Sequence, residues 1–365
     1  MAKKRGASGL SLVVGVDKPV GCSSHDVVNA CRRIFGERRV GHTGTLDPAA
    51  SGALLVCVGP AARLDAHFAN DSKEYLARIA LGASTDTDDA QGQVTMTFPV
   101  PEKATDPDFA QRVLDGFTGT LQQLPPVYSA LKVNGQKACD QARKGNVIDL
   151  APRTVEVSQA KLLRITSGGG AACYEAEGAP GGLQSWQPGP GVASTCEGLP
   201  TWDVLFSVSK GTYIRSLARD IGLSVGCGAH VCALRRTRAG RLDVRECVSL
   251  ETLEQVGTAA ALDPLRLLGM RFAYVDGEAA VRVSHGNALP AEALVLCERR
   301  FEGLDAALCA CTSGVRESCD APRAGETVAL LCCNKLVALY AYDAQRERYV
   351  SVCVFSEGVI RGTGL

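Results

Sequence analysis

Residues 41–52 (GHTGTLDPAASG) place one acidic side chain, Asp47, in a glycine-rich loop that leads into an apolar stretch. Pro48 restricts the residue before it to extended backbone, and three glycines allow close approach or unusual backbone angles. The loop therefore displays one carboxylate on a stiff backbone, just ahead of an apolar strand. A turn with a side chain bonded to its own backbone is the alternative explanation.

Five further segments bear on the role of this loop. In chain order they are residues 17–24 (DKPVGCSS), 73–75 (KEY), 125–135 (PPVYSALKVNG), 209–217 (SKGTYIRSL) and 234–240 (LRRTRAG).

Together with residues 41–52, these segments resemble the motifs of the TruB-type pseudouridine synthases in order and spacing. The resemblance covers about residues 12–250, except for a segment near 167–200 that looks inserted. It implies isomerisation of uridine to pseudouridine at position 55, in the T-loop of tRNA, by base flipping and an aspartate nucleophile. The implied partner is tRNA, through its T-stem-loop, and the implied reaction needs no cofactor and no metal.

The resemblance also assigns roles to single residues. Asp47 is the nucleophile, Tyr75 stacks on the flipped base and takes part in proton transfer, and Arg215 pairs with the Asp47 carboxylate. A neighbouring guanidinium would keep Asp47 ionised and orient it through a two-pronged contact. Read from the residues alone, Tyr75 could instead be a core aromatic of a strand, and Arg215 a solvated residue in the first turn of a helix.

Four residues are expected to bind the substrate. His42 helps to fill the space that the flipped nucleotide leaves, Tyr213 forms a pocket wall, and Leu234 packs against the base. Lys18 belongs to the first of the shared motifs. A histidine in a glycine-rich turn can also be purely structural, so His42 keeps that alternative.

Two other functions remain as alternatives. A tRNA-folding or RNA-binding protein without catalysis could use the same scaffold, although the presence of Asp47, Tyr75 and Arg215 argues against it. A serine hydrolase would rest on Ser224 in the pattern G-x-S-x-G, but a nucleophile elbow must follow a strand, and this pattern follows a predicted helix.

The elements that must position these residues follow from apolar periodicity and helix-capping signals. Helices are predicted over 25–35, 106–117, 137–144 and 213–223, and strands over 10–16, 52–58, 73–81, 128–133, 202–208 and 231–234. This mixture predicts an α+β catalytic domain, residues 1–270, with a mixed or antiparallel sheet flanked by helices. Residues 271–365 read as a small β-rich domain resembling the PUA-like RNA-binding type. The Gly/Pro-rich segment at about 167–200 reads as a flexible insertion.

Composition and charge further limit the kind of protein that this chain can be. The 365 residues carry 39 Lys and Arg against 39 Asp and Glu, so the chain as a whole is not polybasic. Residues 1–45 nevertheless hold eight basic against three acidic residues, and residues 205–245 hold eight against two, which permits a basic face for RNA. No run reaches the 18 apolar residues of a membrane span. The sixteen cysteines form no C-x-x-C pair and the five histidines no H-x-x-H set, which predicts reduced cysteines in a cytoplasmic protein without a metal site. We also expect a monomer.

Overall fold

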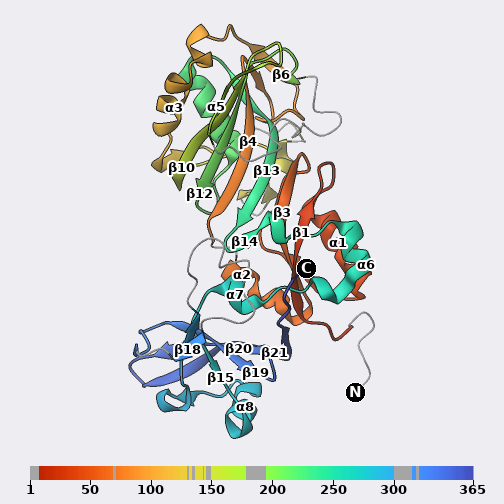
Figure 1. Cartoon of the computed structure of the whole chain (residues 1–365), viewed down its shortest axis with the longest axis vertical. Coiled ribbons are helices and arrows are strands. Elements are labelled where there is room, and N and C mark those ends of the chain that lie inside the picture. Colours follow the sequence, from red (N-terminus) through yellow and green to blue (C-terminus); the bar gives the residue numbers. More distant parts are fainter. Residues whose placement is uncertain are drawn as a thin grey trace.

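The computed structural model describes residues 8–68, 71–129, 131–133, 136–142, 144, 149–177, 195–299, 315–317 and 320–364. A large mixed sheet with flanking helices occupies one part of the molecule, and a second, smaller sheet lies below it in Figure 1. This confirms the predicted fold class of a mixed sheet flanked by helices and followed by a β-rich C-terminal part.

The large sheet has ten strands in the order β1-β3-β13-β4-β12-β10-β11, with β2, β7 and β14 pairing beside this path. All of its pairs are antiparallel except β3 with β13, which run parallel. The strands are β1 (Leu12–Lys18), β2 (Val40–His42), β3 (Ala50–Val58), β4 (Lys73–Leu81), β7 (Gly119–Gln123), β10 (Arg153–Thr166), β11 (Ala172–Glu175), β12 (Thr201–Val208), β13 (Ala229–Ala239) and β14 (Leu242–Asp243).

The helices among the described residues lie mostly against this sheet. They are α1 (Ser24–Phe35), α2 (Asp65–Phe68), α3 (Pro107–Asp115), α4 (Ala138–Ala142), α5 (Ile214–Val225), α6 (Leu250–Val256), α7 (Pro264–Leu268) and α8 (Gly277–Ser284). Two short hairpins pair β5 (Ala83–Thr85) with β6 (Val94–Thr97) and β8 (Lys132–Val133) with β9 (Gln136–Lys137).

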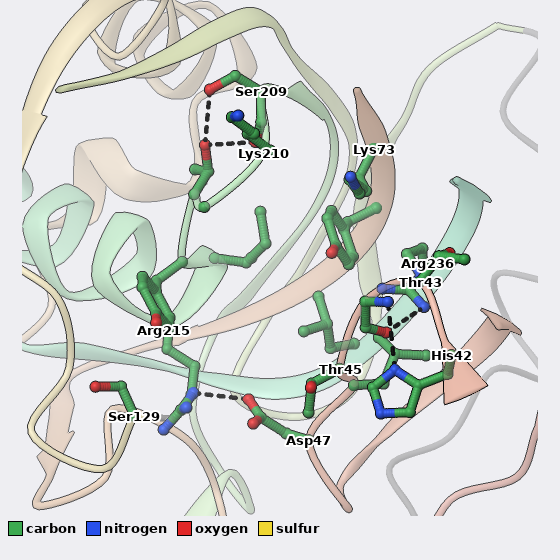
Figure 2. A pocket seen from close by; sticks show the side chains of 18 of the residues that line it. His42, Thr43, Thr45, Asp47, Lys73, Ser129, Ser209, Lys210, Arg215 and Arg236 are labelled. Atoms are coloured by element: carbon green, nitrogen blue, oxygen red, sulfur yellow. Dashed lines mark hydrogen bonds and ion pairs between the residues drawn. The ribbon is translucent and has the colours of Figure 1, made fainter. Parts of the chain in front are cut away.

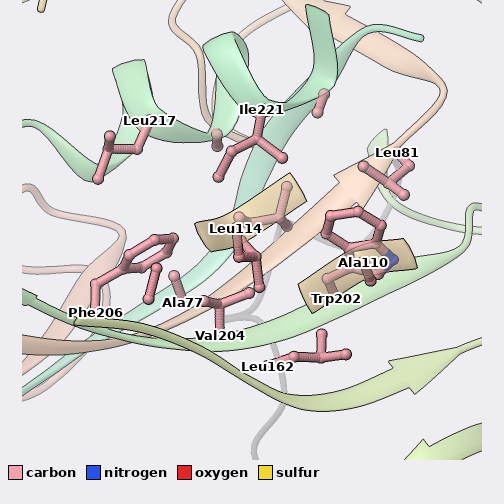
Figure 3. Close-up of a cluster of buried hydrophobic side chains, with 14 of the residues drawn as sticks. Ala77, Leu81, Ala110, Leu114, Leu162, Trp202, Val204, Phe206, Leu217 and Ile221 are labelled. Atoms are coloured by element: carbon pink, nitrogen blue, oxygen red, sulfur yellow. The ribbon is translucent and has the colours of Figure 1, made fainter. Parts of the chain in front are cut away.

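The main core forms where α3 and α5 cover one face of the sheet. Figure 3 shows Leu217 and Ile221 of α5 above Val204 and Phe206 of β12, with Leu114 of α3 between them. These side chains are almost fully buried, and each buried side chain of this size stabilises the fold by roughly 1.5–3 kcal/mol. The first turn of α5 is therefore held rigidly over the sheet.

The second sheet begins at Phe272 and runs in the order β16-β21-β20-β19-β15-β17-β18. Its strands are β15 (Phe272–Tyr274), β16 (Leu289–Pro290), β17 (Cys297–Arg299), β18 (Val315–Glu317), β19 (Thr327–Cys332), β20 (Lys335–Asp343) and β21 (Arg348–Ile360). One buried cluster contains residues of both sheets, such as Leu55 and Phe355, and the backbone amide of Ile360 donates to the Ser11 carbonyl at 2.8 Å. The two sheets thus share a core, and the end of the chain returns to β1.

Local signals in the sequence located most elements well. Ser23 caps α1 together with Asp26 in a capping box, and Gly36 ends the helix in the left-handed conformation. The predicted strand 128–133 is wrong in its first part, because only Lys132–Val133 pairs as β8. β13 is longer than predicted, since the basic run at 235–238 continues the strand.

The predicted insertion at 167–200 is only partly described. Residues 178–194 lie outside the described residues, while β11 adds an ordered strand to the edge of β10. The prediction of reduced cysteines is wrong for one pair, because Cys196 and Cys232 form a disulfide. Five other cysteines are buried and lie outside the disulfide, as expected for small apolar side chains: Cys31, Cys57, Cys227, Cys297 and Cys353. Among the described residues, no helix is both long and apolar enough to cross a bilayer.

Candidate active site

A pocket of about 450 Å³ opens between the loop before β3 and the start of α5. Six of the seven residues predicted for the site line it: His42, Asp47, Tyr75, Tyr213, Arg215 and Leu234. Figure 2 shows Asp47 and Arg215 facing each other on one side, with His42 on the other. The fold therefore brings together residues as far apart in the chain as His42 and Leu234.

The loop that carries Asp47 is anchored on both sides of this residue. The hydroxyl of Ser24 in α1 accepts from the Leu46 amide at 2.9 Å and donates to the Leu46 carbonyl at 3.1 Å. From β13, Arg236 reaches under the loop and donates to the carbonyls of Ala53 at 2.7 Å and Gly44 at 3.1 Å. A buried arginine thus fixes the backbone from which the carboxylate projects.

Of the three glycines in this loop, Gly52 is required by the fold. Its φ is +108°, and a Cβ at this position would lie 2.2 Å from the Arg236 carbonyl oxygen. Gly41 and Gly44 do not have positive φ angles. The glycine-rich composition therefore reflects one close approach, which lets β3 and β13 run side by side below the carboxylate.

Arg215 lies in the first turn of α5, where the Gln123 side chain bonds both backbone groups of Tyr213, the residue before the helix. The Arg215 Nε atom lies 3.0 Å from Oδ2 of Asp47. Its two terminal nitrogens donate to the carbonyls of Thr87 and Tyr128, each at 3.0 Å. The guanidinium is almost fully buried, with 6% of the side chain exposed, and it is shared between Asp47 and backbone acceptors.

A second carboxylate that the sequence reading missed belongs to this group. Asp89 lies 3.6 Å from the Arg215 guanidinium, through its Oδ2 atom. In the sequence, Asp89 belongs to a cluster of acidic residues at 86–89 that reads as a polar surface turn. The turn instead lies against β13, where the Val231 amide donates to the Asp88 carbonyl at 3.1 Å and the Ala90 amide to the Val231 carbonyl at 2.9 Å.

Opposing effects act on the Asp47 carboxyl. Burial raises the pKa of Asp47 above its usual value, the Arg215 guanidinium opposes this shift, the Asp89 carboxylate adds to it, and the Lys18 ammonium opposes it. The side chain keeps 39% of its surface open to the pocket. The arginine therefore limits, but does not reverse, the tendency of the pocket to favour the neutral acid.

The walls of the pocket are apolar and aromatic. Tyr75 of β4 and Leu234 of β13 pack against the main core at the edge of the pocket. Tyr75 shares its strand face with Ala77, Ile79 and Leu81, as the alternating pattern predicted. Tyr213 forms another wall, and burial raises the pKa of its hydroxyl.

His42 ends β2 and lines the pocket beside the loop. Its Nδ1 atom accepts from the Gly44 amide at 3.3 Å. Burial lowers the pKa of His42, and the nearby charges of Arg236 and His25 lower it further. A neutral ring with Nδ1 as acceptor follows, so Nε2 carries the proton and can donate to a ligand.

Lys18 is the predicted site residue that the structure does not bring to the pocket lining. It is fully buried, and its ammonium donates to the carbonyls of Cys22 at 2.7 Å and Pro19 at 2.9 Å. Burial lowers the pKa of Lys18, while the nearby Asp47 carboxylate raises it.

The basic residues of the sequence divide into internal and exposed groups. Arg236 is buried, and Arg235 pairs with Asp17 at 2.7 Å. Two lysines of the shared motifs for which no role was predicted, Lys73 and the exposed Lys210, also line the pocket. Some of the basic residues therefore support the site from inside the protein, and others face the pocket or the solvent.

Two family models match the chain. The model described as TruB family pseudouridylate synthase (N terminal domain) matches residues 32–175, and the model described as tRNA pseudouridylate synthase B C-terminal domain matches residues 215–266.

Curated relatives and solved structures resemble the chain over much of its length. A protein of Deinococcus radiodurans named tRNA pseudouridine synthase B is 43% identical over 258 residues, which are 69% of this chain and 82% of the relative. A protein of the same name from Mycobacterium bovis is 35% identical over 347 residues, 95% of this chain and 96% of the relative. The structure is similar to that of a Cbf5-Nop10-Gar1 complex, with a TM-score of 0.58 at 24% identity, over 95% of this chain and 84% of that chain. At this identity, the structural likeness concerns the fold.

Proposed function

The chain belongs to the TruB family of pseudouridylate synthases, and we propose that its pocket isomerises uridine to pseudouridine in tRNA with Asp47 as the nucleophile. The observation that carries this proposal is the Asp47–Arg215 ion pair of 3.0 Å inside a pocket lined by Tyr75 and Leu234. We further propose position 55 in the T-loop as the target and the T-stem-loop as the part of tRNA that is bound.

The chemistry needs one well-placed carboxylate. The bond from C1′ of the ribose to N1 of uracil breaks, a bond from C1′ to C5 forms, the C5 hydrogen leaves as a proton, and N1 gains a proton. No atom is transferred to a second substrate and no electrons are exchanged with a cofactor. Asp47 can attack C1′, add to C6 or assist glycal formation, and all three routes place the carboxylate beside the same nucleoside.

The pocket suits a nucleotide taken out of its stack. Enzymes that change a base in structured nucleic acid extrude the target nucleotide into a pocket between aromatic or apolar side chains. Tyr75 offers such a ring and Leu234 an apolar contact. We propose that Tyr75 also takes part in moving the proton from C5, and that Tyr213 closes the wall opposite.

The charged neighbours of Asp47 affect its protonation state and its orientation. Arg215 favours the ionised form of Asp47 and fixes its direction, while Asp89 holds the far side of the guanidinium. Lys18 contributes positive charge from beneath the loop, and we propose this electrostatic role in place of direct contact with RNA. His42 presents a ring N–H to the space beside the flipped nucleotide.

RNA contacts outside the pocket involve the basic rim, which we define as Lys73 and Lys210, and the C-terminal sheet. Cations near the entrance attract the phosphates that flank a flipped nucleotide. We propose that residues 271–365 form the PUA-like RNA-binding unit, and that the enzyme acts as a monomer in the cytoplasm without a cofactor for its reaction.

The test is release of tritium from C5-labelled uridine in a T-stem-loop and in whole tRNA, followed by mapping of the modified position. We expect stoichiometric release with wild-type protein, a single modified position at 55, and no release with Asp47→Asn. A protein that binds and folds tRNA without catalysis would give binding but no release. A hydrolase acting through Ser224 would leave the C5 label in place.

A further inference from the structure

A cluster of three potential metal ligands lies behind the pocket, outside the groups used for isomerisation. Cys196, His230 and Cys232 bring one sulfur, one ring nitrogen and one sulfur within 4.8 Å of one another. The Cys196 Sγ atom lies 3.4 Å from Nε2 of His230 and is joined to Cys232 by a disulfide. His230 and Cys232 are buried in β13, and Cys196 comes from the segment that leads into β12.

The histidine is oriented as a ligand. His230 is fully buried, and its Nδ1 atom lies 2.9 Å from the Ala83 carbonyl oxygen. A carbonyl oxygen can only accept, so Nδ1 carries the ring proton and the lone pair of Nε2 points to the sulfurs. Metal-binding histidines are held in this way, with the distal ring N–H donated to a backbone carbonyl or carboxylate.

The backbone explains how Cys232 reaches the same place. The pairing of β13 with β4 shifts register between Val231 and Ala233, so Cys232 lies in a bulge. Bulges turn a side chain away from the direction that regular alternation would give. Thr195, the neighbour of Cys196, donates to the Ala90 carbonyl at 3.4 Å and so ties the approaching segment to the turn that carries Asp89.

We propose that Cys196, His230 and Cys232 bind one Zn²⁺ ion when the disulfide is reduced. In a compartment that holds tRNA and reducing thiols, a lasting disulfide is rare, and cysteines placed in this way more often bind metal or take part in catalysis. Cysteine sulfur and histidine nitrogen are the usual ligands of Zn²⁺, and in a tetrahedral site such atoms lie about 3.6 Å apart. The distance of 3.4 Å from Cys196 Sγ to His230 Nε2 fits one edge of that tetrahedron.

Conversion of the disulfide to the metal-bound form takes two steps. A dithiol reductant gives two electrons and two protons to the Cys196–Cys232 disulfide and leaves as its own disulfide. Zn²⁺ then replaces the two thiol protons, which pass to solvent, and the Nε2 lone pair of His230 forms the third bond. The fourth position is left for water or another small ligand, because three protein ligands leave a tetrahedral site open.

The cluster is next to the catalytic groups. Cys232 lines a small cavity together with Asp47, Asp89 and Arg215. Metal binding would fix Cys196 to β13 at the point where the backbone of Val231 holds the turn of Asp89. The metal would therefore support the position of Asp89 and Arg215 from behind without contacting the substrate.

The test uses the full chain, reduced by a phosphine under anaerobic conditions and freed of metal, with Co²⁺ as the probe. We expect one equivalent of Co²⁺ to produce the intense visible bands of a tetrahedral thiolate site, and Zn²⁺ to abolish them by displacement. Cys196→Ser and Cys232→Ser should each lose the bands. Cys333→Ser is the matched control, since this exposed cysteine has a second sulfur, that of Cys332, 3.7 Å away, and it should keep them.

Three results would overturn the proposal. These are an absence of bands in the wild-type protein, bands that survive both cluster variants, and bands that disappear in Cys333→Ser. Alkylation and mass spectrometry of the reduced protein measure whether Cys196 and Cys232 carry free thiols. A permanent structural disulfide would leave the two cysteines linked and unable to bind the ion. Circular dichroism checks that each variant is folded. Tritium release, measured separately, keeps a failure of this proposal distinct from a failure of the proposed function.

Discussion

Two charged regions of the same pocket differ in burial and in position. In the charged cluster (Asp47, Asp89, Arg215), the guanidinium is buried and its partners are other protein groups. The basic rim (Lys73, Lys210) lies at the pocket edge, and Lys210 is exposed to solvent. A buried guanidinium with several protein partners is held in place before RNA arrives, whereas an exposed ammonium such as that of Lys210 can reach phosphate. We therefore expect the cluster to control the rate of chemistry and the rim to control RNA affinity and its salt dependence.

The largest effect is expected at the centre of the cluster. Asp47→Asn keeps the shape of the side chain but removes the nucleophile, so turnover should fall by at least about 10⁴-fold, while RNA affinity changes only a few-fold. Single-turnover tritium release and filter binding measure the two quantities. Release at a rate near that of the wild type would remove Asp47 from its role.

The same variant should not lose stability. Because the pKa of Asp47 is raised in the folded protein, the stability that this group contributes is present below its unfolded pKa and is lost as pH rises and it ionises. Replacement by a neutral amide removes that loss, so the thermal midpoint of Asp47→Asn at neutral pH should equal or exceed that of the wild type. A clear fall in the midpoint would mean that the ionised carboxylate stabilises the fold.

Arg215→Lys should reduce the single-turnover rate by about 10²–10³-fold, comparable to the loss of an electrostatic donor at an active site. Lysine keeps the charge, but its ammonium cannot reach the two carboxylates and two carbonyls that the planar guanidinium contacts. Arg219→Lys is the matched control. Arg219 lies one helical turn after Arg215 on α5, and it pairs at 3.1 Å with Asp88, the residue before Asp89. Equal effects of the two substitutions would assign Arg215 to structural support.

Tyr75 lines the same pocket, and its substitutions test the role of the aromatic wall. Tyr75→Leu removes the ring, and stacking of a base on an aromatic side chain contributes about 1–3 kcal/mol. Tyr75→Phe keeps the ring and loses only the hydroxyl. If the hydroxyl moves a proton, the Phe variant should bind RNA normally and accumulate an intermediate after cleavage of the glycosidic bond, which quenched-flow analysis would detect. Full activity of the Leu variant would return Tyr75 to the core.

Asp89 gives a smaller effect that depends on pH. Activity needs ionised Asp47, so the single-turnover rate should rise with pH through a pKa above the usual value of a carboxyl group. Asp89→Asn removes a negative charge that raises the pKa of Asp47, so this acid limb should move to lower pH. Asp88→Asn, which changes the neighbouring carboxylate paired with Arg219, is the control and should shift the limb less. An acid limb that stays in place in Asp89→Asn would separate Asp89 from the nucleophile.

Sequence patterns predicted the elements best where the cause is local. The capping box of α1, the alternating faces of β4 and the apolar face of α5 depend on residues within a few positions of one another. Asp47 and Arg215 were identified through motifs, and the structure places them 3.0 Å apart. Their contact joins a loop before β3 to a helix after β12, which no local pattern could specify.

The residues whose roles were not predicted from the sequence all depend on contacts between distant segments. Asp89 looked like part of a surface turn, because its partner lies 126 positions away on α5. Arg236 looked like part of an RNA-binding patch, but β13 runs through the centre of the sheet and buries it. Cys196 and Cys232 showed no ligand spacing, because their proximity depends on how β12 and β13 each pair with β4.

The smallest effect is expected at the rim. Lys210→Ala removes one exposed cation from the pocket edge without touching the charged cluster. Each protein–phosphate contact contributes close to one unit to the slope of log affinity against log salt, so the slope should fall by about one and the affinity by a few-fold. At saturating RNA the single-turnover rate should be unchanged, since the geometry of Asp47 and Arg215 does not depend on this side chain. Lys161→Ala, an exposed lysine on β10 that does not line the pocket, is the control and should leave both quantities unaltered. A fall in the saturating rate of Lys210→Ala with an unchanged salt slope would contradict the division of labour between cluster and rim, and would place Lys210 among the groups that orient the flipped nucleotide.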